Sequence, residues 1–336
     1  MTLTTKGFHH IALVTADAAR AERFYSDVLG VSLLRRRSAR EDSAYALHFG
    51  NAAGEPGTVL TFLEQRGSAR GRPGAGGVHH YALMVDTPEA QLKWKRRLAD
   101  HGVHVAGPYN RGWFRSIYFA DPDGQIVEIA TRGPGYTFDE PATALGGQIV
   151  VPPTAELRGR RDEAEVRARV HADAVPVITP DMQLDGLHHI SGLTDDVARI
   201  GEFYEAALGL RLVKRSVNQD DPSMPHWFWA NYDGREVAPR SSLTMFGGWA
   251  DGGARLVGTL KRAVAGAGQA HHIAFRAADE HELHGWMDHL RSMGIETSGV
   301  LDRRWFRSIE FRAPDGMLME IATDGPGYSA AEREAA

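Results

Sequence analysis

The strongest constraint on the fold is an internal repeat. Trp-Phe-Arg-Ser-Ile occurs at 113–117 and 305–309, and Gly-Pro-Gly-Tyr at 133–136 and 325–328, both with an offset of 192 residues. Near the start of each half the offset is 179, since 24–25 and 203–204 both read Phe-Tyr. The difference, 192 − 179 = 13 residues, indicates an insertion in the second half, which we expect within the Gly- and Ala-rich run 253–269. The chain is therefore predicted to fold as two homologous halves.

A polar connector separates the two halves. The segment that begins at Thr154 is charged and helix-prone, with prolines on both sides. We interpret it as a connector helix in an exposed linker. The predicted organisation is an N-terminal half over 1–150, a linker over 151–184 and a C-terminal half over 185–336.

Each half divides again into two modules. Helical stretches over 17–29, 89–99, 195–208 and 280–293 each follow a strand-like run and precede several short ones. The three strands after each helix, and the absence of a GxGxxG turn, argue against a Rossmann sheet. The prediction is an α+β fold of four βαβββ modules in two homologous halves. Each module opens with a histidine pair: His9-His10, His79-His80, His188-His189 and His271-His272.

Composition excludes several classes of function. The 336 residues contain no cysteine and 16 histidines, so any metal must be bound by nitrogen and oxygen ligands. A net charge of −5 without a basic block argues against nucleic acid and anionic membrane surfaces as partners. No apolar run approaches the roughly 18 residues of a membrane span, and the first ten residues lack a secretory pattern. We expect a cytoplasmic protein that acts on a small molecule, and the oligomeric state stays open, a homo-oligomer included.

The second histidine of each pair is the predicted metal ligand. Adjacent strand residues point to opposite faces, and the second histidines share their face with the small residues Ala12, Ala82, Ser191 and Ala274. Small neighbours leave room for a metal or ligand. A lone strand histidine is more often structural, but four pairs in register favour ligands. They are His10, His80, His189 and His272.

Two glutamates complete the predicted ligand sets. Glu128 and Glu320 each lie inside an apolar strand, where a carboxylate must be paired or bound to a cation. The alternative to a bound cation is an ion pair of these carboxylates with an arginine such as Arg115 or Arg307. Two histidines and one carboxylate form a facial triad that suits non-haem Fe(II). Manganese, zinc or nickel could occupy the same ligands.

Longer motifs point to a known family. The second half contains Asp302-Arg-Arg-Trp-Phe-Arg-Ser-Ile followed by Pro314-Asp-Gly-Met-Leu-Met-Glu-Ile-Ala, and Arg111-Gly-Trp-Phe-Arg-Ser-Ile-Tyr repeats the pattern in the first half. With the run 208–221, these motifs resemble the vicinal oxygen chelate superfamily, which includes glyoxalase I, bleomycin-resistance proteins and extradiol dioxygenases. More narrowly, they resemble hydroquinone-type ring-cleaving dioxygenases, and the resemblance covers nearly the whole chain.

The resemblance implies that modules pair across the halves into metal-holding cups. Carried over residue by residue, the family's ligands are His10, His272 and Glu320. Repeat symmetry implies a second triad of His80, Glu128 and His189. Pairing within each half would instead bring His80 beside His10.

The surroundings of the two triads differ. The family's hydroxyl two residues after the first-module histidine is matched by Ser191 but not by Ala12, and its tyrosine ten residues before the glutamate by Tyr118 but not by Glu310. A pocket histidine is matched by His226, where the first module has Ala46. We therefore favour the triad of His80, Glu128 and His189. The candidate catalytic residues around it are His79, Arg111, Tyr118, His188, Ser191 and His226.

The substrate pocket is predicted to be aromatic. Its candidates are Trp113, Phe114, Trp227, Phe228 and Trp229, with Arg303 as the arginine of the other triad; simple core packing is the alternative for the aromatic residues. The sequence thus predicts an Fe(II)-dependent extradiol dioxygenase that cleaves a hydroquinone or catechol with O2. The rivals are a glyoxalase-like isomerase or lyase, and a non-enzymatic binding or resistance protein, which would lack metal ligands in its cup.

Overall fold

The structure is a computed structural model that describes residues 3–37, 45–248 and 260–328. The first module contains β1 (Phe8–Thr15), α1 (Ala18–Arg23), a π-helical continuation η1 (Phe24–Val28), β2 (Ser32–Arg37), β3 (Ala46–Gly50) and β4 (Val59–Glu64). The second contains β5 (Gly77–Val85), α2 (Pro88–Asp100), β6 (Ala106–Asn110), β7 (Arg115–Ala120) and β8 (Ile126–Thr131). The third contains β9 (Leu187–Thr194), α4 (Val197–Leu208), β10 (Arg211–Val217), β11 (Pro225–Ala230) and β12 (Ser242–Gly247). The fourth contains β13 (Ala270–Ala277), α5 (Glu280–Ser292), β14 (Leu301–Asp302), β15 (Phe306–Arg312) and β16 (Leu318–Pro326).

The modules pair across the halves. The described strands form two eight-stranded sheets, with the orders β14-β15-β16-β13-β1-β4-β3-β2 and β10-β11-β12-β9-β5-β8-β7-β6. β1 pairs antiparallel with β13, and β5 with β9. The first sheet therefore joins modules one and four, and the second joins modules two and three. This confirms the predicted α+β fold of four βαβββ modules and the pairing of modules across the halves.

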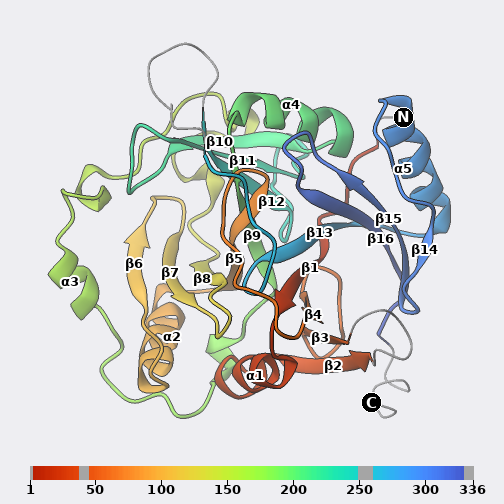
Figure 1. Ribbon diagram of the computed structural model, residues 1–336. Coiled ribbons are helices and arrows are strands. Elements are labelled where there is room, and N and C mark those ends of the chain that lie inside the picture. Colours follow the sequence, from red (N-terminus) through yellow and green to blue (C-terminus); the bar gives the residue numbers. More distant parts are fainter. Residues whose placement is uncertain (1–2, 38–44, 249–259, 329–336) are drawn as a thin grey trace.

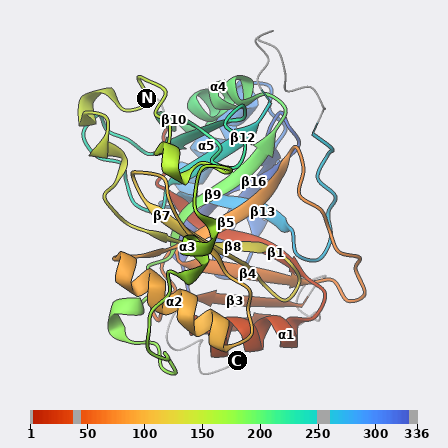
Figure 2. The same cartoon turned by 90° about the vertical axis from the view of Figure 1, so that its left-hand side faces the viewer.

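The main helices lie on the outer faces of the two sheets (Figures 1 and 2). Alternate strand residues, such as Tyr81 and Leu83 of β5, face these helices and join Trp94 of α2 in one large apolar core. The opposite faces carry two smaller apolar clusters, one around Trp113 and one around Trp305. The period of two in each strand thus separates the core from the faces that hold the candidate sites.

Side-chain caps explain where the helices begin. Asp17, Thr87, Asp196 and Asp279 each accept a hydrogen bond from a backbone N–H in the first turn of α1, α2, α4 and α5. These residues lie within two positions of the predicted helix starts. α4 is capped after Leu208 by Gly209, whose φ of 65° is a left-handed conformation that favours glycine.

The segment between the halves is anchored by two buried cations of α2. Lys95 Nζ donates to the carbonyls of Gly107, Val166, Arg167 and Arg169 at 2.7–3.1 Å. Arg97 donates to the carbonyls of Asp27, Val28, Val175 and Pro176. The linker contains the short helix α3 (Glu163–Ala168) and the 3-10 turns η4 (Thr154–Glu156) and η5 (Pro180–Met182), and η2 (Tyr136–Phe138) and η3 (Ala142–Ala144) precede it.

The predicted insertion run lies partly outside the described residues. The structure does not describe positions 253–259 of this run. Residues 260–269 lie alongside the segment 70–75, to which they are joined by isolated β-bridges such as the one between Arg72 and Val264. None of the helices in the described ranges is long and apolar enough to cross a membrane.

We predict that Lys95→Met releases α3 from the sheet. A helix of six residues is too short to be stable alone, and the substitution leaves its final carbonyls without their ammonium donor. The loss should be about 1–3 kcal/mol of stability and should speed trypsin cleavage after Arg167 and Arg169. Lys93→Met is the matched control, because Lys93 forms only an exposed ion pair with Asp181. Equal cleavage rates in the two variants would contradict the prediction.

Candidate metal centres

A β-bulge lies at the histidine pair of each module's first strand. In the pairing of β5 with β9 the register shifts between Val78 and His80 and between Ala82 and Leu83, so that His79 and His188 have no partner residue. The pairing of β1 with β13 has the equivalent shifts at His9 and His271. A bulge adds one residue to a strand and re-aims its side chains.

The bulges bring both histidines of each pair together. The Nδ1 atoms lie 2.8 Å apart in all four pairs: His9-His10, His79-His80, His188-His189 and His271-His272. The strict alternation of faces that we expected from an extended strand is therefore wrong at these positions, because the extra residue of the bulge breaks it.

The second histidines and the two glutamates form two triads, one on the helix-free face of each sheet. We call the face with His80, Glu128 and His189 cup A, and the face with His10, His272 and Glu320 cup B. In each triad one donor atom per residue lies within 4.8 Å of the others. Each cup takes one histidine and the glutamate from one half of the chain, and the remaining histidine from the other half.

The separations in cup A fit ligands of one metal ion. His80 Nε2 lies 3.3 Å from His189 Nε2, and Glu128 Oε2 lies 3.0 and 3.3 Å from these two atoms. Ligands about 2.1 Å from a metal are separated by about 3.0 Å at 90° and about 3.4 Å at the tetrahedral angle. The distances therefore suit both an octahedral facial set and a tetrahedral site.

Cup B has the same geometry. His10 Nε2 lies 3.1 Å from His272 Nε2, and Glu320 Oε2 lies 3.4 and 3.1 Å from them. The two triads therefore differ little in the positions of their ligand atoms. Any difference in function must come from the residues around them.

The two glutamates are buried, ionised and available to bind a cation. Glu128 and Glu320 are fully buried, and no oxygen of either carboxylate has a hydrogen-bond partner among the described residues. Burial raises the pKa of Glu128, but His189 and His80 outweigh it, and the net direction is well below the usual value. The pKa of Glu320 is likewise lowered by His272 and His10 against the effect of burial. Both groups therefore stay ionised and available to a metal.

The arginines considered as alternative partners lie elsewhere. Arg307 pairs with Glu280 at 2.7 Å, and Arg115 is exposed at the start of β7. Arg303, the nearest arginine to Glu320, has its Nε 3.8 Å from Oε1. The carboxylates are thus surrounded by histidine nitrogens, as in a metal site.

The first histidine of each pair supports the ligand beside it. The ligand's Nε2 faces the metal position, so its Nδ1–H is free to donate to the neighbouring Nδ1. Burial lowers the pKa of His79 and His188 to about 3, which keeps both rings neutral and able to accept through Nδ1. These two predicted catalytic residues lie behind the ligands, where they fix ring orientation.

A continuous polar network surrounds the triad of cup A. Arg111 donates to the Tyr118 hydroxyl at 3.3 Å, and its other terminal nitrogen lies 3.4 Å from His226 Nδ1. His226 Nε2 lies 2.6 Å from Thr244 Oγ1, which is 3.0 Å from Ser191 Oγ. The structure thus brings together four residues predicted from the sequence and adds Thr244. The signal that could have identified Thr244 is the pair Leu243-Thr244, which repeats Leu60-Thr61 of the first module.

The polar residues of cup B form separate groups. Arg303 donates to Glu310 at 2.6 Å, where cup A has Arg111 and Tyr118. His48 Nδ1 lies 3.0 Å from Thr61 Oγ1 and 3.1 Å from the Tyr328 hydroxyl. Sequence comparison found only Ala46 at the position of the pocket histidine and missed His48, which takes the place of Phe228. The available signal was a histidine inside the apolar strand 46–50.

The predicted aromatic residues divide between two faces. Trp113 and Phe114 line a cleft of about 890 Å³ with His188 and Tyr136, and Phe114 lies 5.4 Å from the ring of His189. Phe228 belongs to the same apolar cluster. Trp227 and Trp229 instead pack on the helix side. There Trp229 contacts α4 so closely that a Cβ at Gly201 would lie 2.4 Å from its ring.

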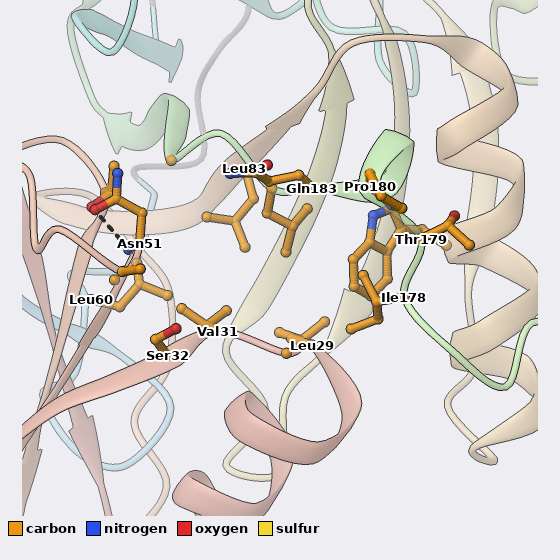
Figure 3. A pocket seen from close by; sticks show the side chains of 17 residues that line it. Leu29, Val31, Ser32, Asn51, Leu60, Leu83, Ile178, Thr179, Pro180 and Gln183 are labelled. Atoms are coloured by element: carbon orange, nitrogen blue, oxygen red, sulfur yellow. Dashed lines mark hydrogen bonds between the residues drawn. The ribbon is translucent and has the colours of Figure 1, made fainter.

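A second cavity lies away from both cups. It measures about 440 Å³ and is enclosed by the η1–β2 connection and the linker around Ile178 and Pro180, as Figure 3 shows. Leu60 and Leu83 contribute to it from strand faces opposite those of the triads. The cavity therefore does not reach the ligand atoms of either cup.

The family is shown by sequence as well as by fold. The model of the Glyoxalase/Bleomycin resistance protein/Dioxygenase superfamily matches residues 7–129 and 186–321. The chain belongs to this superfamily. The two matched ranges contain all six histidines and glutamates of the two triads.

Relatives and solved structures agree with this assignment. The "Putative ring-cleaving dioxygenase MhqA" of Bacillus subtilis (strain 168) is 28% identical over 327 residues, which cover 97% of this chain and 89% of the relative. The chlorohydroquinone/hydroquinone 1,2-dioxygenase of Sphingobium indicum is 24% identical over 328 residues, covering 94% and 85%. A crystal structure of a "putative dioxygenase" from Bacillus subtilis aligns with a TM-score of 0.72 at 25% identity, covering 99% and 90% of the two chains. Glyoxalase I from Zea mays shares the fold, with a TM-score of 0.60 at 16% identity and coverage of 95% and 92%.

We predict that replacement of His79 by Phe weakens metal binding at cup A. The aromatic ring remains, but the acceptor for the Nδ1–H of His80 is lost, and such supporting residues typically contribute about 10–100-fold in metal affinity. The measurement is a competition titration with a chelator, in which the unmodified chain should bind two divalent ions. His104→Phe, at an exposed position before β6, is the control. An unchanged affinity in His79→Phe would contradict the role of the bulged histidine.

Proposed function

We propose that the protein is an Fe(II)-dependent dioxygenase that opens the aromatic ring of a hydroquinone or catechol at cup A. The class of reaction is supported by relatives named as ring-cleaving dioxygenases over nearly the full length of the chain. The observation that carries the choice of site is the continuous network from Tyr118 through Arg111, His226 and Thr244 to Ser191. Cup B has no equivalent network among the described residues.

Arg111 favours an anionic substrate oxygen. It is 8% exposed, and none of the described carboxylates lies within 4.0 Å of it. A buried guanidinium without a carboxylate partner is costly, and an anion bound beside it removes that cost. Deprotonation of a phenolic hydroxyl supplies such an anion next to the metal ligands.

The other groups of cup A orient the substrate and hold protons. Burial and the charge of Glu128 raise the pKa of Tyr118, so its hydroxyl stays protonated and can donate to a substrate oxygen. His226 accepts from Arg111 through Nδ1 and donates from Nε2 to Thr244, and this fixes the guanidinium. Phe114 and Phe228 supply apolar walls for an aromatic ring.

The residues present fit a divalent metal at cup A, with His80, Glu128 and His189 as its ligands. When bound, the metal would supply a Lewis acid and the one-electron chemistry that lets dioxygen react with an aromatic ring.

The chemistry of the two cups differs at the tyrosine position. Glu310 occupies this position in cup B and pairs with Arg303, so the arginine is already neutralised. A phenolate is therefore less stabilised there than beside Arg111. This contrast, rather than the ligand geometry, supports ring cleavage at cup A.

We predict that Glu128→Ala and His189→Ala abolish turnover, because each removes a ligand of cup A. His10→Ala and Glu320→Ala should leave much of it. The measurement is oxygen uptake by the Fe(II)-loaded protein with a panel of dihydroxybenzenes, with absorbance of the ring-opened product followed in parallel. Circular dichroism of each variant controls for folding.

Three outcomes are decisive. Oxygen uptake that survives only in the Glu128 and His189 variants would place ring cleavage at cup B. Equal partial losses in all four variants would mean that both cups cleave the ring. Absence of oxygen uptake across the panel would overturn the dioxygenase proposal in favour of an oxygen-independent member of the superfamily.

A further inference from the structure

The repeated Gly-Pro-Gly-Tyr motif supplies no ligand of either triad. It ends at Tyr136 in the first half and at Tyr328 in the second. Each tyrosine lies close to the tryptophan of the other repeated motif. Trp305 stacks on Tyr328 with a ring separation of 5.3 Å, and Trp113 and Tyr136 both contact the ring of Phe228, at 5.9 and 6.0 Å. The two repeated motifs therefore meet in space, at an aromatic wall of each cup.

A buried cation lies over the tryptophan of each wall. Lys214 of β10 is fully buried, and its ammonium lies 5.3 Å from the centre of the Trp113 ring. The position 179 residues earlier is Arg35 of β2, whose guanidinium lies 6.0 Å from the ring of Trp305. Both distances are within the range of a cation–π contact. Each cation comes from one half of the chain and each tryptophan from the other, so the contact follows the pairing of modules across the halves.

In cup A the same lysine also holds the chain that follows β8. We call residues 133–148 the closing segment. Lys214 Nζ donates to the carbonyl of Tyr136 at 3.0 Å, to Glu140 Oε2 at 2.6 Å and to the carboxylate of Asp139. An ammonium has three N–H donors, so these three contacts use all of them. Lys214 thus fixes residues 136–140 against β10.

The rest of the closing segment is held by neighbouring residues. Arg215 donates to the carbonyls of Gly146 and Gly147 at 2.9 and 2.6 Å. The hydroxyl of Tyr232 donates to the carbonyl of Ala142. These contacts attach the far end of the closing segment. The end that carries Tyr136 is held from β10 by Lys214.

The closing segment contributes to the cleft of about 890 Å³ beside cup A. Tyr136 and Trp113 line this cleft together with Phe114 and residues 235–240. The hydroxyl of Tyr136 lies 2.7 Å from Ser242 Oγ, which also lines it. Phe114 in turn contacts a ligand ring of cup A. The positions of Tyr136 and Trp113 therefore determine the shape of the cleft next to the metal ligands.

Charge explains why the position of Tyr136 depends on Lys214. Glu140 is only 2% exposed, and a buried carboxylate is costly without a cation beside it. If the ammonium is removed, Glu140 lowers its free energy by moving into water. Tyr136 lies four residues earlier in the same segment and also loses its carbonyl donor. The aromatic wall should therefore shift, although none of the contacts of Lys214 is with a residue of the triad.

We propose that Lys214 is a positioning residue of cup A, which holds Tyr136 and Trp113 in place and thereby sets the affinity of the cup for an aromatic substrate. The inference rests on the proposed function, since it takes cup A as the site of the aromatic ring. Lys214 acts through the wall and not on the metal ligands. Its loss should therefore weaken binding and leave the chemical step nearly unchanged.

The test uses 4-nitrocatechol, a dihydroxybenzene whose absorbance changes when a hydroxyl group ionises. The full-length protein carries Glu320→Ala, which removes a ligand of cup B, and is loaded with Zn(II), which avoids redox chemistry. Lys214→Met should weaken binding of the probe about three- to tenfold, the effect of one aromatic contact. Lys214→Arg restores a cation of the kind that cup B has at position 35, and should recover most of the affinity. Lys93→Met, at an exposed ion pair, is the control and should bind the probe as the parent does.

Two further measurements separate positioning of the substrate from a purely structural role. Hydrogen exchange of the closing segment, where the amides of Gly135 and Phe138 are hydrogen-bonded, should be faster in Lys214→Met and normal in Lys214→Arg. In the Fe(II)-loaded protein, Lys214→Met should raise KM by the same factor as the dissociation constant of the probe, with kcat within about twofold. Glu140→Gln keeps the shape of the side chain and should shift affinity and exchange in the same direction. It also covers the case in which Lys214→Met does not fold.

The outcomes distinguish this inference from the proposed function. Equal probe affinity in the parent and in all variants of Lys214 and Glu140 would overturn the positioning role, even if hydrogen exchange became faster. A fall in kcat without a change in KM would overturn it too, and so would failure of the Glu320→Ala parent to bind the probe. Probe affinities in the expected order, but no oxygen uptake by the Fe(II)-loaded unmodified chain, would support the positioning role and refute ring cleavage.

Discussion

Both candidate metal centres depend on the same kind of contact, the antiparallel pairing of a strand from each half of the chain. Across β5 and β9, His80 lies opposite Ser191 and Ala82 lies opposite His189, so the two histidines are diagonal neighbours on one face. A slip of one residue would turn one of them into the helix-side core. Register is well determined here, because Tyr81 and Ile190 are fully buried on the other face. The same packing that stabilises the fold therefore positions the ligands.

Burial of the two carboxylates determines what this arrangement can bind. An ionised glutamate inside a sheet is unfavourable unless positive or hydrogen-donating groups surround it. In cup A the surrounding groups are two histidine nitrogens that face Glu128 without hydrogen-bonding to it. A divalent cation satisfies all three residues at once. The first histidines of the bulged pairs then fix the orientation in which the ligand rings meet that cation.

Much of the fold and of the candidate sites could be predicted from the sequence because the motifs that define them occur in both halves of the chain. The repeated Trp-Phe-Arg-Ser-Ile motif and the histidine pairs defined the modules. The small residues beside His80 and His189 singled out the second histidines, which the structure gathers with Glu128 into a candidate metal site. The bulges could not be predicted, because a strand with one extra residue has the same local pattern as a regular one. The anchoring of the linker by Lys95 could not be predicted from the sequence either, because the acceptors of Lys95 are backbone carbonyls from several segments.

The differences between the cups show why comparison of repeats position by position loses information. A histidine that is shifted by two residues along a strand stays on the same face of the sheet. His48 and His226 differ by such a shift, and each still contacts the equivalent threonine of its own module, Thr61 or Thr244. Alignment records a loss at Ala46, while the structure shows that His48 contacts Thr61 through Nδ1, whereas His226 contacts Thr244 through Nε2. Together with Glu310 in place of Tyr118, this shift changes the polar groups around a triad while the triad itself keeps its geometry. Two copies of one scaffold thus differ in the residues around their candidate metal ligands and not in the ligands themselves.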